Sequence, residues 1–167
     1  MISWRQAGIP IFPIGVLILG VLTVIVMRFN QYHGGTLAGR TSAAVVERGK
    51  LGYRQYCASC HGSQLQGQPD WKSPLPNGRL PAPPHDASGH TWHHPDVVLA
   101  GITRRGLKPY VSGDYESDMP AFEGILSEQQ IGDILSYIKS TWPERERGYQ
   151  MKMTEQSPSD PVAANAK

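Results

Sequence analysis

The longest apolar stretch of this chain lies close to its N-terminus. Residues Ile9–Met27 include no charged side chain, and a helix of that length, at about 1.5 Å per residue, spans roughly the hydrocarbon core of a bilayer. The stretch is longer than the usual apolar region of a signal peptide, about 7–15 residues, and no good cleavage site follows it. We therefore predict an uncleaved membrane anchor in residues 1–31, with its helix at about 9–29.

A short linker and a helix follow this anchor. Residues 32–41 are rich in glycine and polar side chains and are expected to be flexible. A helix is predicted over Ser42–Tyr56, because a hydroxyl-bearing N-cap opens it and apolar positions recur on one of its faces. Gly49 lies inside this helix, where glycine lowers helix stability. It either marks the close crossing of a second helix, flanked by Tyr53, or is simply tolerated.

A second amphipathic helix is predicted near the end of the same domain. Ser127 and Gln130 have the spacing of a capping box, and an apolar stripe follows at helical period in residues 131–142, before a proline ends it. The domain at 42–143 is therefore expected to contain two packed terminal helices. The polar residues 144–167 carry no apolar stripe and are expected to form a disordered tail.

Prolines and glycines interrupt the middle of the domain. Six prolines lie between Gln68 and Asp86, which excludes regular structure there. After them a helix is predicted from His94 to about Arg105, with Pro95 at its first position and a glycine as its stop. The domain is thus expected to be all-helical, with long irregular loops.

Composition narrows the possible functions. The net charge of +2 gives no strongly basic surface, so we predict no nucleic-acid partner. Gly 18 and Pro 14 together exceed the usual share without reaching a disordered composition. A small domain wrapped around a cofactor would have this composition, because the cofactor holds long loops in place.

The two cysteines of the chain, Cys57 and Cys60, lie three residues apart, and His61 follows directly. This is the C-x-x-C-H pattern of covalent haem attachment. Each thiol adds across one haem vinyl group, and the next side chain can then supply an imidazole nitrogen to the iron. Such attachment also implies a compartment outside the cytoplasm.

Other interpretations of the same residues exist. A redox dithiol of the thioredoxin type needs a βαβ context, which the pattern does not predict. A closed zinc site needs four ligands, and the chain has no second cysteine pair. A plain disulfide leaves the neighbouring histidine incidental. Haem is favoured because the histidine is adjacent and a second axial ligand can be found.

That second ligand is Met119. Of the other four methionines, two belong to the anchor and two to the polar tail. Met119 lies in an irregular stretch, and Pro120 after it stiffens the backbone that must hold a weakly binding thioether. The alternative is a core methionine that fills a packing gap.

Residues 43–142 resemble the class I cytochrome c family in its single-haem, membrane-anchored bacterial form. The residues that carry the resemblance are Gly49, Tyr53, Cys57, Cys60, His61, Met119, Pro120, Ala121, Phe122 and Tyr137. The resemblance implies an all-α class I cytochrome c fold, here preceded by one transmembrane helix. It also implies one haem c attached through Cys57 and Cys60, with His61 and Met119 as the iron ligands.

Further haem contacts are predicted from residues whose patterns are less specific. In related cytochromes a proline carbonyl accepts a hydrogen bond from the second nitrogen of the proximal histidine, and here Pro83 or Pro84 is the candidate. Arg79 and Trp92 are candidates for the haem propionates. The alternatives are loop packing for the prolines, a surface arginine and a packed indole.

Three histidines, His90, His93 and His94, form the densest histidine cluster of the chain. One of them could replace Met119 on the iron, or the cluster could bind copper or zinc, with His85 as a further candidate ligand. The favoured interpretation is simpler. The cluster leads into the helix that starts near Pro95, and no ligand is required there.

We therefore expect an electron carrier rather than an enzyme. With both axial positions filled by protein, no open site remains for oxygen or peroxide. The domain would lie on the periplasmic side of the cytoplasmic membrane and exchange electrons with a quinol-oxidising complex, a terminal oxidase or a dehydrogenase. The alternatives are a cytochrome c subunit of a larger membrane-bound oxidase or dehydrogenase, and a haem sensor or haem enzyme.

The charges near Met119 suggest the nature of a partner. The acidic residues around it are Asp114, Glu116, Asp118 and Glu123. An acidic face would favour a partner with a basic docking patch. The alternative is that these residues are solvated loop charges.

Overall fold

The structure, a computed structural model, describes residues 42–157, 159 and 162. Its elements, in chain order, are α2 (Ala43–Tyr56), α3 (Ala58–His61), the 3₁₀ helix η1 (Thr91–His93), α4 (Asp96–Arg105), the 3₁₀ helix η2 (Lys108–Tyr110), α5 (Glu128–Ser140) and α6 (Glu144–Gln156). No strand is found among these residues. The all-helical domain expected from the sequence is therefore confirmed.

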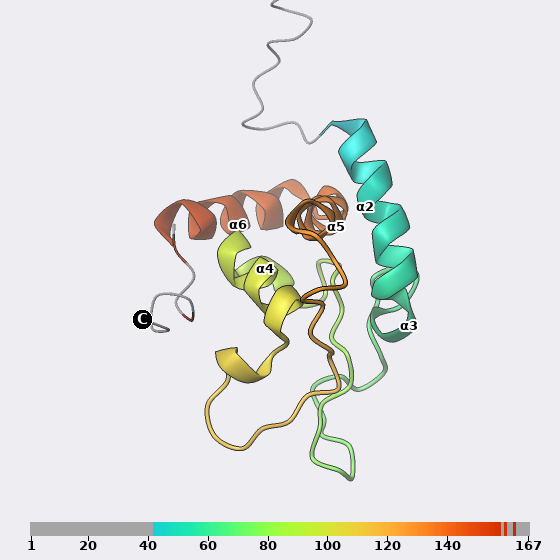
Figure 1. Ribbon diagram of the computed structural model, residues 1–167, viewed down its shortest axis with the longest axis vertical. Helices are drawn as coiled ribbons and strands as arrows, with labels where there is room; N and C mark the ends of the chain where they lie inside the picture. The colour runs from blue at the N-terminus through green and yellow to red at the C-terminus, as the bar shows by residue number, and fades with distance from the viewer. Residues whose placement is uncertain (1–41, 158, 160–161, 163–167) are drawn as a thin grey trace, which may run out of the picture. The chain divides into compact units, whose positions relative to one another are not determined.

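Helix α2 crosses α5, and this pair forms the main helix contact of the fold (Figure 1). The Ser42 side chain caps α2 by accepting a hydrogen bond from the Val45 amide. At the crossing, a Cβ on Gly49 would lie 1.9 Å from the carbonyl oxygen of Asp133. The close approach of the two backbones therefore requires glycine, which is the first of the two interpretations that the sequence allowed.

Helix α5 supplies four of the ten buried apolar residues of the core, more than any other helix. The capping box of Ser127 and Gln130 is present with both of its hydrogen bonds. The buried apolar residues of the fold are Tyr53, Leu65, Leu99, Phe122, Leu126, Ile131, Ile134, Leu135, Ile138 and Trp142. Half of these lie in residues 131–142, which confirms the apolar stripe that the sequence indicated. An ion pair between Arg48 Nε and Asp133 Oδ2 at 2.7 Å borders the crossing.

Helix α4 begins one residue later than expected. Pro95 is its N-cap rather than its first helical residue, and Gly106 ends it with φ of 74°. Lys139 of α5 donates hydrogen bonds to both carboxylate oxygens of Asp96, at 2.9 and 2.7 Å. An acidic residue in the first turn of α4 also suits the positive end of the helix dipole.

The expectation of a disordered tail after residue 143 is wrong for Glu144–Gln156, which form α6. No apolar stripe holds this helix. Instead the buried Gln150 side chain donates hydrogen bonds to the His94 carbonyl at 3.3 Å and to Asp96 Oδ1 at 2.6 Å. Thr154 Oγ1 accepts a hydrogen bond from the Asp96 amide at 3.0 Å. Polar long-range contacts stabilise α6, and an apolar pattern cannot reveal them.

The predicted anchor helix at about 9–29 and the linker at 32–41 lie outside the described residues. In the part of the chain that the structure describes, no helix is long and apolar enough to cross a membrane.

Candidate haem site

The two cysteines flank a single helical turn. Cys57 follows α2 directly, and α3 carries Cys60 and His61. Neither thiol is in a disulfide: Cys57 is half-buried and Cys60 is exposed. Burial raises the pKa of Cys57 to about 11, and the neighbouring Cys60 adds to the shift. Because residues three apart share one face of a helical turn, both thiols are available to the same ligand.

His61 is buried and its ring is held by a backbone carbonyl. Its Nδ1 lies 2.8 Å from the Pro83 oxygen. A carbonyl can only accept, so Nδ1 carries the proton and Nε2 keeps its lone pair free for a metal. Burial lowers the pKa of His61, against a smaller opposite effect of the Pro83 bond. Of the two candidate prolines, Pro83 makes this contact, whereas the Pro84 carbonyl accepts a hydrogen bond from Thr91 Oγ1 at 3.4 Å.

Two further residues fix the segment around His61, and neither role was predicted from the sequence. The Tyr53 hydroxyl donates a hydrogen bond to the Gly62 carbonyl at 2.8 Å, and burial holds the pKa of this phenol above its usual range. The imidazole of His85 stacks on that of His61. Burial lowers the pKa of His85 well below its usual value, so its ring is neutral. In the sequence, His85 stood out only by its place after the Pro83-Pro84 pair and as a further candidate for the histidine cluster.

The segment that carries Met119 is fastened to the end of α4. The Phe122 amide donates to the Thr103 carbonyl at 3.1 Å and the Glu123 amide to the Arg104 carbonyl at 2.9 Å. The Phe122 ring meets the Tyr56 ring edge-on, with centroids 6.2 Å apart. Because Tyr56 immediately precedes Cys57, this contact joins the methionine segment to the helix that leads into the cysteine motif.

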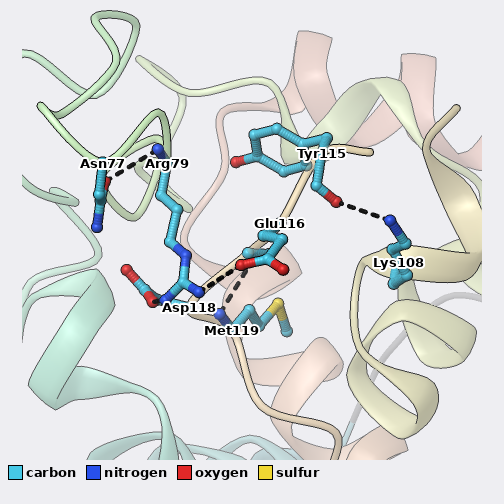
Figure 2. Close-up of polar contacts among 8 residues, drawn as sticks. Asn77, Arg79, Lys108, Tyr115, Glu116, Asp118 and Met119 are labelled. Carbon is cyan, nitrogen blue, oxygen red and sulfur yellow. Dashed lines mark hydrogen bonds and ion pairs between the residues drawn. The ribbon is translucent and has the colours of Figure 1, made fainter. Parts of the chain in front are cut away.

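Arg79 ties the proline-rich loop to the same segment (Figure 2). Its guanidinium forms ion pairs with Glu116, at 2.6 Å, and with Asp118. Figure 2 shows the Met119 thioether directed away from this guanidinium.

These ion pairs involve two of the four carboxylates that were expected to make this face acidic. The hydrogen bond to Arg79 lowers the pKa of Glu116. A cavity of about 460 Å³ opens beside Met119 and is also lined by Arg79, Lys108 and Glu116.

Comparison with known families agrees with this geometry. The Cytochrome c family model matches residues 46–142, which is more than half of the chain. This chain belongs to the cytochrome c family. No curated protein and no solved structure matches it significantly. Membership of the cytochrome c family implies a covalently bound haem c, and a role in electron transfer rather than in catalysis.

The residues of this cytochrome c fit such a haem. The free thiols of Cys57 and Cys60 precede a histidine whose Nε2 is free to bind iron. The indole Nε1 of Trp92 is buried and has no hydrogen-bond partner among the described residues. A buried N–H normally has one, and a propionate oxygen would satisfy it. Trp92 packs on His93 and on Tyr149 of α6, so it and Arg79 are held by different parts of the fold.

The three clustered histidines form no metal site in the described part of the cytochrome. His90 stacks on Trp71, with ring centroids 5.4 Å apart, and meets His94 edge-on. Among the described residues, no group of three or more His, Cys, Asp or Glu side chains is placed to hold a metal ion. The structural part of the favoured interpretation is supported, because Pro95, directly after His94, is the N-cap of α4.

Proposed function

We propose that this cytochrome c is a membrane-tethered carrier that transfers single electrons through a haem c ligated by His61 and Met119. The observation that carries the proposal is the hydrogen bond from His61 Nδ1 to the Pro83 carbonyl at 2.8 Å. This bond fixes the tautomer in which Nε2 can bind iron, and it orients the ring and raises its basicity. When bound, haem c supplies an iron that alternates between Fe(III) and Fe(II).

Met119 supports the second half of this ligand set. Pro120 restricts its backbone, and the hydrogen bonds of residues 122 and 123 to the end of α4 hold the segment in place. A thioether is a soft ligand that favours Fe(II), so a His/Met pair raises the reduction potential relative to a His/His pair. With the same two side chains bound in both oxidation states, the protein rearranges little during electron transfer.

The proposed location follows from the N-terminus. The apolar run Ile9–Met27 would anchor the chain in the cytoplasmic membrane, with the domain on the periplasmic side, where haem attachment takes place. The linker at 32–41 would reach on the order of 18 Å as a random coil. We propose that the cytochrome exchanges electrons there with membrane-bound redox complexes of a respiratory chain, a quinol-oxidising complex and a terminal oxidase or dehydrogenase.

Replacing Met119 by alanine tests the ligand set. The wild-type ferric protein is expected to be low-spin and to show the weak methionine–iron charge-transfer band. Met119→Ala should abolish this band and lower the reduction potential, because a water or another weak ligand replaces the thioether.

A matched control is Met151→Ala, since Met151 is an exposed residue of α6 and should leave the spectrum unchanged. An unaltered charge-transfer band in Met119→Ala would show that another side chain binds the iron. A stoichiometric protein complex that co-purifies in mild detergent would favour a subunit of an oxidase or dehydrogenase over a free carrier.

A further inference from the structure

His85 lies face to face with the histidine of the C-x-x-C-H motif. The ring centroids of His61 and His85 are 4.0 Å apart, and the two ring planes are inclined by 25°. This is the separation of two stacked aromatic rings in contact. No other ring stacks on His61 among the described residues, so the His85 ring is the one that covers a face of the His61 imidazole.

His85 itself is fixed from several directions. Its ring Nδ1 lies 2.8 Å from Thr91 Oγ1. Its carbonyl accepts a hydrogen bond from Trp142 Nε1 at 2.7 Å, and its amide donates to the Leu65 carbonyl at 2.7 Å. The ring of Tyr53 meets it edge-on at 6.3 Å. Both the backbone and the ring of His85 therefore have little freedom to move.

The Pro83 bond alone does not fix the plane of the His61 ring. A single hydrogen bond sets the position of Nδ1, but the ring can still rock about the line through that contact. A second flat ring against its face removes this motion, because tilting His61 would drive it into His85 or open a gap that is costly in a packed interior. The two contacts together define both the direction and the plane of the imidazole.

We propose that His85 is a positioning residue that holds the His61 ring in one plane relative to the haem. The inference rests on the proposed function, in which His61 is an axial ligand. The plane of an axial imidazole determines how the orbitals of the iron split and how unpaired spin spreads over the porphyrin. A well-defined His61 plane therefore gives the ferric haem one electronic structure rather than a mixture.

The experiment compares haem-loaded variants by NMR and EPR of the ferric state. His85→Leu removes the flat ring and keeps an apolar side chain of similar size. We expect it to shift and reorder the haem methyl resonances and to broaden the low-spin EPR signal. His85→Phe retains a flat ring and should stay close to the wild-type pattern. Thr91→Val removes the hydrogen bond that anchors the His85 ring, together with the longer one to the Pro84 carbonyl, and should give a smaller shift in the same direction.

His90→Leu is the matched control, because this exposed histidine stacks on Trp71 and not on His61. It should leave the resonances unchanged. Wild-type resonances in both His85→Leu and Thr91→Val would overturn the proposal. If His85→Leu fails to accumulate, the other two variants test the proposal. It predicts shifted haem resonances in Thr91→Val and a near wild-type pattern in His85→Phe, an order that a merely structural role of His85 does not predict.

A separate variant distinguishes this inference from the function on which it rests. His61→Ala should lose the low-spin spectrum if His61 binds the iron. If the low-spin spectrum survives in His61→Ala, the proposed ligand set is wrong. If it is lost, and the His85 and Thr91 variants still match the wild type, only the role of His85 fails.

Discussion

The α2–α5 crossing depends on a single missing side-chain atom. Gly49 lies where the backbone of α5 approaches most closely, and the atoms that a Cβ would meet first are the carbonyl oxygen and carbon of Asp133, at 1.9 and 2.5 Å. Backbone atoms of a packed helix cannot rotate away as a flexible side chain can. Any larger residue must therefore push the two helices apart.

Gly49→Ala should lower the free energy of unfolding by about 2–3 kcal/mol, the upper part of the range of about 1–3 kcal/mol for overpacking in a dense core. Gly132→Ala is the control, because a Cβ there meets nothing within 4 Å and alanine favours a helix by about 0.5–1 kcal/mol over glycine. Guanidinium chloride unfolding of both haem-loaded variants measures the difference. Equal unfolding midpoints for Gly49→Ala and the wild type would mean that the two helices can move apart without a loss of stability.

At the scale of elements, irregular segments rather than helices hold the part of the site that carries Met119. The proline-rich loop and the segment before Met119 are joined by the ion pairs of Arg79 with Glu116 and Asp118. The Leu80 amide also donates a hydrogen bond to the Tyr115 hydroxyl at 3.3 Å. These contacts are exposed, so they steady the segment without contributing much to overall stability.

Arg79→Gln should let the Met119 segment open more often. Added imidazole, which could enter through the cavity beside Met119, should then bind the ferric protein several-fold more tightly, a size typical of exposed ion pairs. Titration of the charge-transfer band with imidazole measures this affinity. Salt should raise the affinity of the wild type towards that of the variant, because it screens the ion pairs.

Two further proteins complete this test. The double variant Glu116→Gln, Asp118→Asn removes the same ion pairs from the other side and should match Arg79→Gln. Arg54→Gln changes an exposed arginine at the end of α2 and should bind imidazole as the wild type does. The idea fails if the double variant keeps wild-type affinity.

At the scale of the whole molecule, the N-terminal segment is proposed to determine where the cytochrome works. The full chain should sediment with membranes and be released by detergent but not by high salt, because an apolar helix is held by burial in lipid rather than by charge. A chain that starts at Ser42 should appear in the soluble periplasmic fraction, provided that it keeps an export signal, with the same haem spectrum. A full chain that salt alone releases would contradict the anchor.

Much of this molecule was predictable because it depends on neighbours in the sequence. The N-cap at Ser42, the capping box at Ser127 and the stop at Gly106 arise from residues within a few positions of one another. The cysteine motif is equally local, since its chemistry needs two thiols and a histidine at fixed spacing. The membrane anchor rests on the same kind of pattern and stays a prediction.

Contacts between distant residues could be decided only by the tertiary structure. The choice of Pro83 over Pro84, the stacking of His85 on His61 and the pairing of Arg79 with Glu116 depend on how loops close around the site. Helix α6 was missed because polar contacts of Gln150 and Thr154 with Asp96 hold it, and no apolar period records them. Local chemistry can be read along a chain, whereas a contact between distant residues exists only once the chain has folded.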